Sequence, residues 1–380
     1  MKKNIYLMYA ISLLQGMVFY GPVATLYRQA QGVSIFQITV IESVSLLLCL
    51  LLEIPLGVAA DKIGYKRTMI LCCWLYFLSK LVFWQAADFM GFLLERVMLS
   101  VVMAGLSGVD VSILYLSCEE GKSQRVFGVY NGLLTAGLLI ASLVFSVFVK
   151  DDYKLAGGLT AVSYALAALA SLFLTEVRPK EARALSRSTF KAALTQVLKD
   201  RHLLLLLAAI AFLSETHQTL TVFLSQLQYV RCGLSSAAIG YLYAAVTVAG
   251  LTGMCSAIFT RQAGMRTAGN LLYAAAAVSC AVLAFTGSAA LSVGSILTLR
   301  ISNSLFQPLQ MEQQNRHVHT DNRATALSIN AMIIDSVGVG TNLAFGALAQ
   351  SRLSAAFLFG TGLCAAGGLL FFRACRTKSS

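Results

Sequence analysis

Charged residues are scarce in this sequence. Asp, Glu, Lys and Arg make up only 12% of the 380 residues, whereas about 25% is usual in soluble domains. Hydrophobic residues make up 57% of the chain. This balance excludes an ordinary soluble domain and indicates a protein that folds in a lipid bilayer.

The sequence also lacks the short motifs that mark common enzymes. It contains no G-x-S-x-G, no H-E-x-x-H and no P-loop, so neither acyl transfer nor nucleotide hydrolysis has a recognisable site. Nine cysteines show no pairing pattern and no His–Cys spacing suited to a metal. We therefore expect no enzymatic activity, no cofactor and no bound metal.

Long apolar runs fill most of the chain, and each has about the 20 residues that a membrane-spanning helix needs. The twelve segments expected to span are 5–27, 34–60, 66–87, 89–116, 126–149, 157–176, 203–229, 236–259, 267–286, 288–312, 324–349 and 355–372. No A-x-A-like cleavage site follows the basic start, so we expect the first segment to be retained. The predicted fold class is an all-α membrane protein.

The formal net charge of +12 follows from where the basic residues lie. Most of the 29 Lys and Arg fall in tails and loops on the side of the N-terminus, the asymmetry that marks the cytoplasmic face. The exceptions are Arg28, Lys150, Lys154, Arg231 and Arg352 on the other side, and Lys80, Arg96 and Arg300 inside spans. We expect both termini in the cytoplasm, a bacterial-type cytoplasmic membrane, and no nucleic-acid partner.

The longest polar stretch divides the twelve spans into two sets of six. Residues 177–202 are rich in Lys and Arg and are expected to form a basic cytoplasmic linker with an amphipathic helix. The predicted domains are an N-terminal six-helix bundle at 1–176 and a C-terminal bundle with a short tail at 203–380. The two halves also match weakly: "GVAADKIGYK" from Gly57 aligns with "AIFTRQAGMR" from Ala257, and Arg96 aligns with Arg300. Such six-helix repeats are a known transporter design.

The connection after the second span carries the sharpest motif in the chain. "GVAADKIGYKRT" resembles the loop signature G-x-x-x-D-[R/K]-x-G-[R/K]-[R/K] of the major facilitator superfamily. Together with twelve spans, the six-and-six division and a basic central loop, it makes the whole chain similar to that family. The resemblance implies two six-helix bundles and alternating access, with a gating loop formed by Gly57, Asp61, Lys62, Gly64, Lys66 and Arg67. Tyr65 stands where the family often has its first arginine after the glycine.

Polar side chains inside the spans are the candidate binding residues, because charges at bilayer depth normally face a cavity or pair with one another. The candidates for substrate or proton binding are Glu42, Arg96, Asp110, Glu215, His217, Arg300, Asn303, Gln307 and Asp335. A buried carboxyl group can load and unload protons near neutrality, which favours Glu215 or Asp335 as the proton carrier. A static ion pair is the alternative for each charged residue.

Without an ATP-binding motif, transport is expected to be driven by a gradient. The favoured interpretation is a monomeric secondary transporter that couples protons to the efflux of a small amphipathic organic compound. The alternatives are uptake or exchange of a small polar or anionic metabolite, with Arg96 and Arg300 as anion ligands, and a flippase for lipids or lipid-linked sugars. A receptor or scaffold on the same fold would need long soluble extensions or an elaborate loop.

Overall fold

A computed structural model shows an all-helical chain with no strand among the residues that it describes, which are 2–119, 122–177, 194–195, 197–317 and 323–375. The predicted linker lies mostly outside these residues. Twelve helical segments in the described chain are long and apolar enough to cross a membrane, and each overlaps one predicted segment. The prediction of twelve spans is confirmed. The sixth span occupies Tyr153–Leu172, about four residues before its predicted place.

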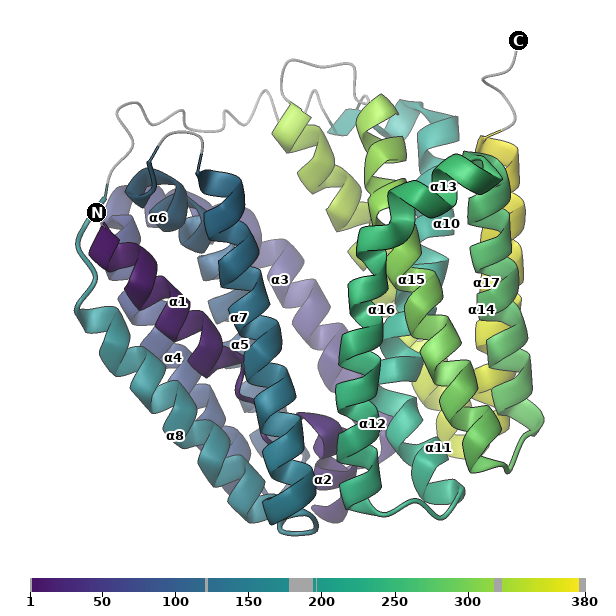
Figure 1. Cartoon of the computed structure of the whole chain (residues 1–380), viewed down its shortest axis with the longest axis horizontal. Coiled ribbons are helices and arrows are strands. Elements are labelled where there is room, and N and C mark those ends of the chain that lie inside the picture. Colours follow the sequence, from purple (N-terminus) through teal and green to yellow (C-terminus); the bar gives the residue numbers. More distant parts are fainter. Residues whose placement is uncertain (1, 120–121, 178–193, 196, 318–322, 376–380) are drawn as a thin grey trace. The chain divides into compact units, whose positions relative to one another are not determined.

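The described chain divides into two compact units. The first comprises residues 1–37, 44–184 and 235–244, and the second comprises residues 38–43, 185–234 and 245–380. Figure 1 shows the first unit mainly in purple to teal and the second mainly in green to yellow. The domain boundaries at 176 and 203 remain a prediction.

The described residues of the first six spans form eight α-helices, one short 3₁₀ helix (η1) and one π-helix (η2). In chain order they are α1 (Lys2–Gly16), η1 (Gly21–Val23), α2 (Ala24–Ala30), α3 (Ile35–Ile63), α4 (Tyr65–Gln85), α5 (Phe89–Leu106), α6 (Val109–Ser117), α7 (Ser123–Val144), η2 (Phe145–Val149) and α8 (Tyr153–Leu172). The first span is thus broken between α1 and α2. The fourth is broken at Gly108, whose φ of 81° ends the regular helix.

The second six spans follow the same plan with different interruptions. Their elements are α10 (Arg201–Gln218), η3 (Thr219–Leu224), α11 (Ser225–Arg231), α12 (Ser236–Ala249), η4 (Gly250–Cys255), α13 (Ser256–Ala263), α14 (Met265–Phe285), α15 (Ala289–His317), α16 (Arg323–Ser351) and α17 (Leu353–Ala374). The π-helical η3 and the 3₁₀-helical η4 replace regular helix within spans seven and eight. Departures of this kind inside long helices often mark functional positions.

Corresponding helices pack in corresponding pairs within each unit. In the first unit α1 packs on α7 and α8, and α4 packs on α5 and α8. In the second unit α10 packs on α16 and α17, and α14 packs on α15 and α17. Spans 1, 3, 4, 5 and 6 therefore have the same neighbours as spans 7, 9, 10, 11 and 12, which supports the repeat seen in the sequence.

Aromatic side chains fill the interior of both units. In the second unit Tyr273, Phe306 and Phe371 lie within 5.1–5.7 Å of one another by ring centroid, and all three are almost fully buried. A side chain at Gly269 would overlap the Phe371 ring. The glycine therefore gives α17 room to pack its phenylalanine on α14.

In the first unit, α1 and α7 pack closely at a pair of glycines. A Cβ added at Gly137 would overlap the Leu13 carbonyl oxygen and lie 2.9 Å from the Gly16 backbone. Small residues allow membrane helices to pack this closely, and close packing drives their association because lipid tails are as apolar as the side chains. Gly132, one turn earlier on α7, would meet no atom within 4 Å.

We predict that Gly137→Ala destabilises the protein while Gly132→Ala does not. Forcing a methyl group into the α1–α7 contact should lower the free energy of unfolding by about 1–3 kcal/mol. Thermal unfolding of the two purified variants in the same detergent measures the difference. Equal melting temperatures would show that the α1–α7 contact is looser than described.

Candidate functional site

The polar residues of span seven point to two different neighbours in the second unit. Glu215, near the end of α10, is 8% exposed, and its carboxylate lies against Gly338 of α16, where a Cβ would come within 2.7 Å of it. Asp335 lies one turn before Gly338 on α16, and α16 packs on α10. The two carboxylates that the sequence favoured as proton carriers are therefore on neighbouring helices.

His217 and Thr221 lie near α15 rather than α16. His217 is 5% exposed, and its Nε2 lies 3.5 Å from Nη1 of Arg300 and 3.3 Å from the Thr221 hydroxyl. A guanidinium can only donate hydrogen bonds, so in this arrangement Nε2 is the acceptor and the imidazole is neutral. The histidine thus accepts from Arg300, which makes Glu215 the stronger candidate for carrying a proton.

The Arg300 guanidinium packs against the backbone of Gly250, where there is no room for a side chain. Any side chain at Gly250, the first residue of η4, would overlap its guanidinium. The Thr252 hydroxyl donates to the Ala249 carbonyl oxygen in the same stretch, and the 3₁₀ turns of η4 pack on α15. The interruption of span eight is therefore the place where Arg300 is accommodated.

Further polar groups extend the cluster along α15 and α16. Asn303 lies one turn after Arg300, is 3% exposed, and its Oδ1 has no hydrogen-bond partner among the described residues. The Thr219 hydroxyl donates to Oδ1 of Asn342 over 2.7 Å. Gln307, also a predicted site residue, is exposed. We refer to Glu215, His217, Arg300, Asn303, Asp335 and Asn342 as the C-terminal polar cluster.

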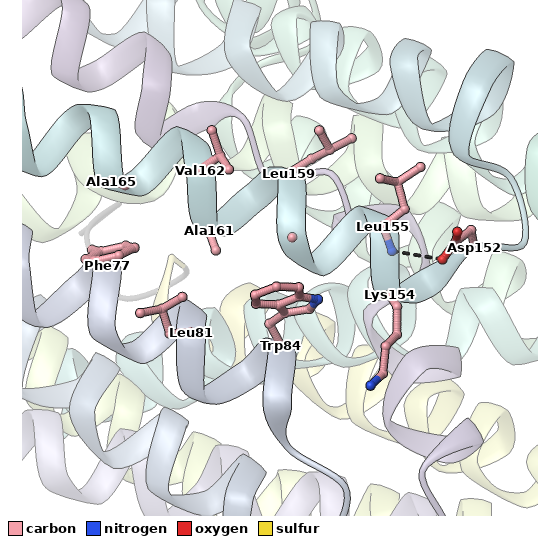
Figure 2. A pocket seen from close by; sticks show the side chains of 11 residues that line it. Phe77, Leu81, Trp84, Asp152, Lys154, Leu155, Leu159, Ala161, Val162 and Ala165 are labelled. Atoms are coloured by element: carbon pink, nitrogen blue, oxygen red, sulfur yellow. Dashed lines mark hydrogen bonds between the residues drawn. The ribbon is translucent and has the colours of Figure 1, made fainter.

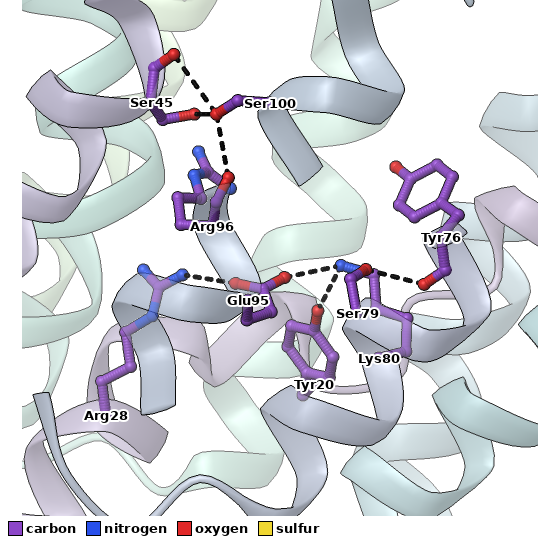
Figure 3. A network of polar contacts seen from close by, with 9 residues as sticks. All are labelled: Tyr20, Arg28, Ser45, Tyr76, Ser79, Lys80, Glu95, Arg96 and Ser100. Carbon is purple, nitrogen blue, oxygen red and sulfur yellow. Dashed lines mark hydrogen bonds and ion pairs between the residues drawn. The ribbon is translucent and has the colours of Figure 1, made fainter. Parts of the chain in front are cut away.

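A second group of buried charges lies in the first unit (Figure 3). The ammonium group of Lys80 on α4 lies 3.0 Å from a carboxylate oxygen of Glu95 on α5, and it also donates to the Tyr20 hydroxyl over 3.0 Å. Arg28 on α2 lies 4.0 Å from the other Glu95 oxygen. Exposed fractions are 4%, 4% and 1% for Arg28, Lys80 and Glu95. This ion cluster joins α2, the second half of span one, to spans three and four.

Aromatic rings surround the two cations. Lys80 lies 5.2–5.7 Å from the centroids of the rings of Tyr20, Tyr76 and Tyr164. Arg28 lies 5.8 Å and 6.0 Å from the centroids of Phe83 and Phe92. Contacts of cations with ring faces add to the ion pairs where water is excluded. The cluster combines the features that make buried charge tolerable.

Glu95 was missed by the sequence interpretation, and Arg28 was placed in a loop on the far side. The signal for Glu95 lies in its spacing, because Phe92, Glu95, Leu99 and Val102 are all buried on one stripe of α5. A charge within an apolar stripe faces a neighbouring helix and needs a partner there. Arg28 is one such partner. It reaches Glu95 because the first span is broken after α1, so that α2 is a separate helix.

The remaining predicted residues of the spans are dispersed. Glu42 on α3 is buried. Arg96 on α5 is half-buried, and its carbonyl oxygen accepts from the Ser100 hydroxyl, which also lies 2.8 Å from that of Ser45 (Figure 3). Asp110 lies beyond the break at Gly108, with the Tyr130 hydroxyl at 3.4 Å. Arg96 and Asp110 therefore lie on two different helices of span four, because the left-handed Gly108 separates α6 from α5.

The predicted gating loop is mostly helical. Gly57, Asp61 and Lys62 belong to the last two turns of α3, Lys66 and Arg67 open α4, and only Gly64 lies between the two helices. Its φ of 100° is a conformation that glycine adopts readily. No atom lies within 4 Å of a Cβ at Gly57, so no close helix approach in its unit explains that glycine.

Two carboxylates hold the turn at Gly64. Asp61 accepts a hydrogen bond from the Tyr65 hydroxyl over 3.1 Å, so the tyrosine contacts the aspartate from the place where an arginine was expected. Glu176, just after span six, accepts from the backbone N–H of Lys66 over 3.2 Å. An anion at a helix N-terminus accepts a hydrogen bond from a free N–H group and interacts favourably with the positive end of the helix dipole. Glu176 was not predicted from the sequence.

The equivalent turn in the second half has the same backbone. Gly264 begins α14 with φ 78° and ψ 143°, compared with 100° and 145° at Gly64. Both glycines are followed by a helix of 21 residues. The alignment of the two loop segments therefore corresponds to a real structural equivalence.

Comparison with known proteins identifies the family. The family model described as Major Facilitator Superfamily matches residues 5–341. The chain belongs to the major facilitator superfamily. An uncharacterized MFS-type transporter of Methanocaldococcus jannaschii is 23% identical over 146 residues, a match that covers 38% of this chain and 38% of that protein.

Solved structures of superfamily members share the fold. The nucleoside transporter NupG superposes with a TM-score of 0.83 at 15% identity and covers 99% of this chain and 100% of its own. A bacterial homolog of the human lysosomal transporter Spinster, in an inward-facing and unoccupied conformation, gives 0.75 at 17% identity, with 98% and 96% covered. The human organic anion transporter MFSD10 gives 0.66 at 15% identity, with 97% and 99% covered.

Membership of the superfamily gives the coarse function. The chain is a multi-pass membrane protein, and its family and structural neighbours indicate a transporter of small molecules rather than an enzyme.

We predict that Glu95→Gln strongly destabilises the protein. Losing the charge that Lys80 and Arg28 share leaves buried cations uncompensated, a change that costs about 3–5 kcal/mol when one partner of a buried pair is removed. Thermal unfolding in detergent measures the loss.

The control for this prediction is Glu119→Gln. Glu119 forms an exposed pair with Lys122 between spans four and five, and exposed pairs contribute little to stability. A Glu95→Gln melting temperature equal to that of the control would contradict a stabilising role for the ion cluster.

Proposed function

We propose that the protein is a proton-coupled secondary transporter in which Glu215 and Asp335 form the proton site, and that it exports a small amphipathic organic compound. The observation that carries the coupling is the contact of the Glu215 carboxylate with Gly338, one turn from Asp335. Burial and a second carboxylate both favour the protonated form of an acid. Neutralisation of one of the two carboxylates relieves their repulsion.

The basic residues near Glu215 support a mechanism in which protonation of Glu215 and substrate binding affect each other. Arg300 and His217 lie in the same unit and contact each other, so the C-terminal polar cluster holds acids and bases on adjacent helices. A proton gained or lost by Glu215 changes the local charge next to Arg300 and His217. In this way protonation can be coupled to the binding of a substrate that contacts the same side chains.

A second candidate function is uptake or exchange of a small polar or anionic metabolite. Two observations favour it. The guanidinium of Arg300 packs against Gly250, and Oδ1 of Asn303 is buried and accepts no hydrogen bond from the described residues. A group with both acceptors and donors would satisfy Arg300 and Asn303 together. The similarity to a nucleoside transporter and to an organic anion transporter makes such compounds sensible members of a screen.

We predict that Glu215→Gln and Asp335→Asn uncouple transport from the pH gradient. Both replacements keep the shape of the side chain and remove its ability to change charge. In proteoliposomes, accumulation driven by a pH gradient should fall to background, while counterflow between two substrate pools should persist. Glu119→Gln, which removes an exposed carboxylate outside the spans, is the control. Normal proton coupling in both variants would overturn the assignment.

The substrate class can be tested with a thermal-shift screen of the purified protein at two pH values. The panel contains lipophilic cations, nucleosides, sugars, organic anions and lipid-like compounds. A ligand present at 100 times its Kd stabilises the folded state by about 2.7 kcal/mol, which is readily measured. Stabilisation by lipophilic cations supports export, and stabilisation by nucleosides or organic anions supports the second candidate.

We predict that Arg300→Gln separates the two candidates. A hydrogen bond to a charged group contributes about 1.5–3 kcal/mol, so an anionic ligand held by Arg300 should bind about 10- to 100-fold more weakly. A lipophilic cation should bind at least as well as before. If the variant binds an anionic ligand with unchanged affinity, Arg300 is not its ligand.

A further inference from the structure

A groove of about 630 Å³ lies between α4 and α8 of the first unit (Figure 2). Its volume is in the range of about 300–1,000 Å³ that is usual for ligand sites. Phe77, Leu81 and Trp84 line it from α4, and Leu155 and Val162 line it from α8. None of these residues belongs to the C-terminal polar cluster or to the ion cluster.

The groove exists because Trp84 lies flat on small residues of α8. A Cβ at Gly157 would come within 2.8 Å of the indole, and one at Gly158 would lie 3.5 Å from it. The ring therefore covers the helix backbone and forms the floor at one end. Ala161 and Ala165 continue the groove toward Phe77 at the other end (Figure 2).

The outer face of α8 is apolar and exposed within a membrane-spanning helix. Leu155, Val162, Leu166 and Leu169 are between 45% and 59% exposed, and they follow a helical spacing of three, four and seven residues. In a bilayer such a face meets lipid, because an apolar surface in a spanning helix is stable only against hydrocarbon or protein. An acyl chain is the ligand that matches the walls of the groove.

One end of the groove carries polar groups of both signs. Lys154 and Asp152 lie there together with Trp84 (Figure 2). Oδ1 of Asp152 accepts from the backbone N–H of Leu155 over 2.9 Å. Neither the ammonium of Lys154 nor the indole N–H of Trp84 has a polar partner among the described side chains and backbone. Two free donors therefore sit beside a carboxylate.

The charge of this end selects among headgroups. Asp152 and Lys154, the charged residues that line this end, sum to zero formal charge, so the rim is not a basic patch of the kind that attracts anionic lipid. A headgroup with a phosphate and a primary ammonium fits both signs: the phosphate accepts from Lys154 and Trp84, and the ammonium donates to Asp152. A quaternary ammonium has no N–H to donate.

We infer that the groove binds one phospholipid with a zwitterionic headgroup that carries a primary ammonium, such as phosphatidylethanolamine. The acyl chain lies along Phe77, Leu81 and Val162, and the phosphate lies between Lys154 and Trp84. Trp and Lys at the ends of spans commonly contact lipid headgroups of any kind. Here the charges of both signs at the rim favour a zwitterionic headgroup over the others. The bound lipid would hold α4 and α8 together where the groove leaves them apart.

The two tryptophans of the chain allow a direct test. Trp74→Phe leaves Trp84 as the single tryptophan, and bromine atoms on an acyl chain quench its fluorescence only on contact. The full-length variant is reconstituted into nanodiscs of fixed composition. A small fraction of the lipid is brominated phosphatidylethanolamine, phosphatidylcholine or phosphatidylglycerol in separate samples.

We predict that brominated phosphatidylethanolamine quenches Trp84 at a several-fold lower fraction than the other two lipids. Lys154→Gln removes the phosphate contact and should raise the fraction of brominated phosphatidylethanolamine needed for quenching by about five- to tenfold, as expected for the loss of a charge-assisted hydrogen bond. Lys150→Gln makes the same change in charge at a residue that does not line the groove, and should leave that fraction unchanged.

Three results would overturn the inference. Equal quenching by all three lipids would show that the groove meets bulk lipid without selection. A preference for phosphatidylglycerol would show that an anionic headgroup binds. A fraction of phosphatidylethanolamine for quenching that Lys154→Gln leaves unchanged, or that Lys150→Gln raises equally, would show that the predicted phosphate contact is wrong. Because the test reads lipid contact alone, it is independent of proton coupling and substrate.

Discussion

A hydrocarbon interior offers no partner to a charge or to a backbone N–H, so each polar group inside the spans must find one within the protein. The ion cluster of the first unit meets this constraint by pairing opposite charges. Glu95 shares its charge between Lys80 and Arg28, and aromatic faces cover both cations. Helices from three different spans are joined by these contacts, which makes the cluster a fixed element of the unit.

The C-terminal polar cluster meets the same constraint differently. The Glu215 carboxylate lies against Gly338 of α16, while His217, on the same helix as Glu215, contacts Arg300 of α15. Acidic and basic groups from three helices thus lie within one cluster. Glu95 and Glu215 therefore have different surroundings: Glu95 lies between two cations, and Glu215, the proposed proton carrier, lies against a glycine.

Interruptions of helices are the means by which these groups are placed. The break after α1 brings Arg28 to Glu95, the π-helical η3 follows His217, and the 3₁₀-helical η4 makes room for Arg300. Each interruption leaves backbone groups that must be satisfied locally. They occur where side chains, such as the Thr221 hydroxyl on the His217 carbonyl oxygen, supply the missing partner.

The sequence alone determined the class of the protein, its twelve spans, the equivalence of the two halves at Gly64 and Gly264, and the residue types that need partners. These follow from properties that act locally or sum along the chain: hydropathy over about 20 residues and the conformational freedom of glycine. The pairing of charges was decided only by tertiary structure. Glu95 and Arg28 are 67 positions apart, and their contact depends on a helix break that hydropathy does not reveal. For the same reason Glu176 at the Gly64 turn, the Glu215–Asp335 pair and the α4–α8 groove appear only when distant helices pack together.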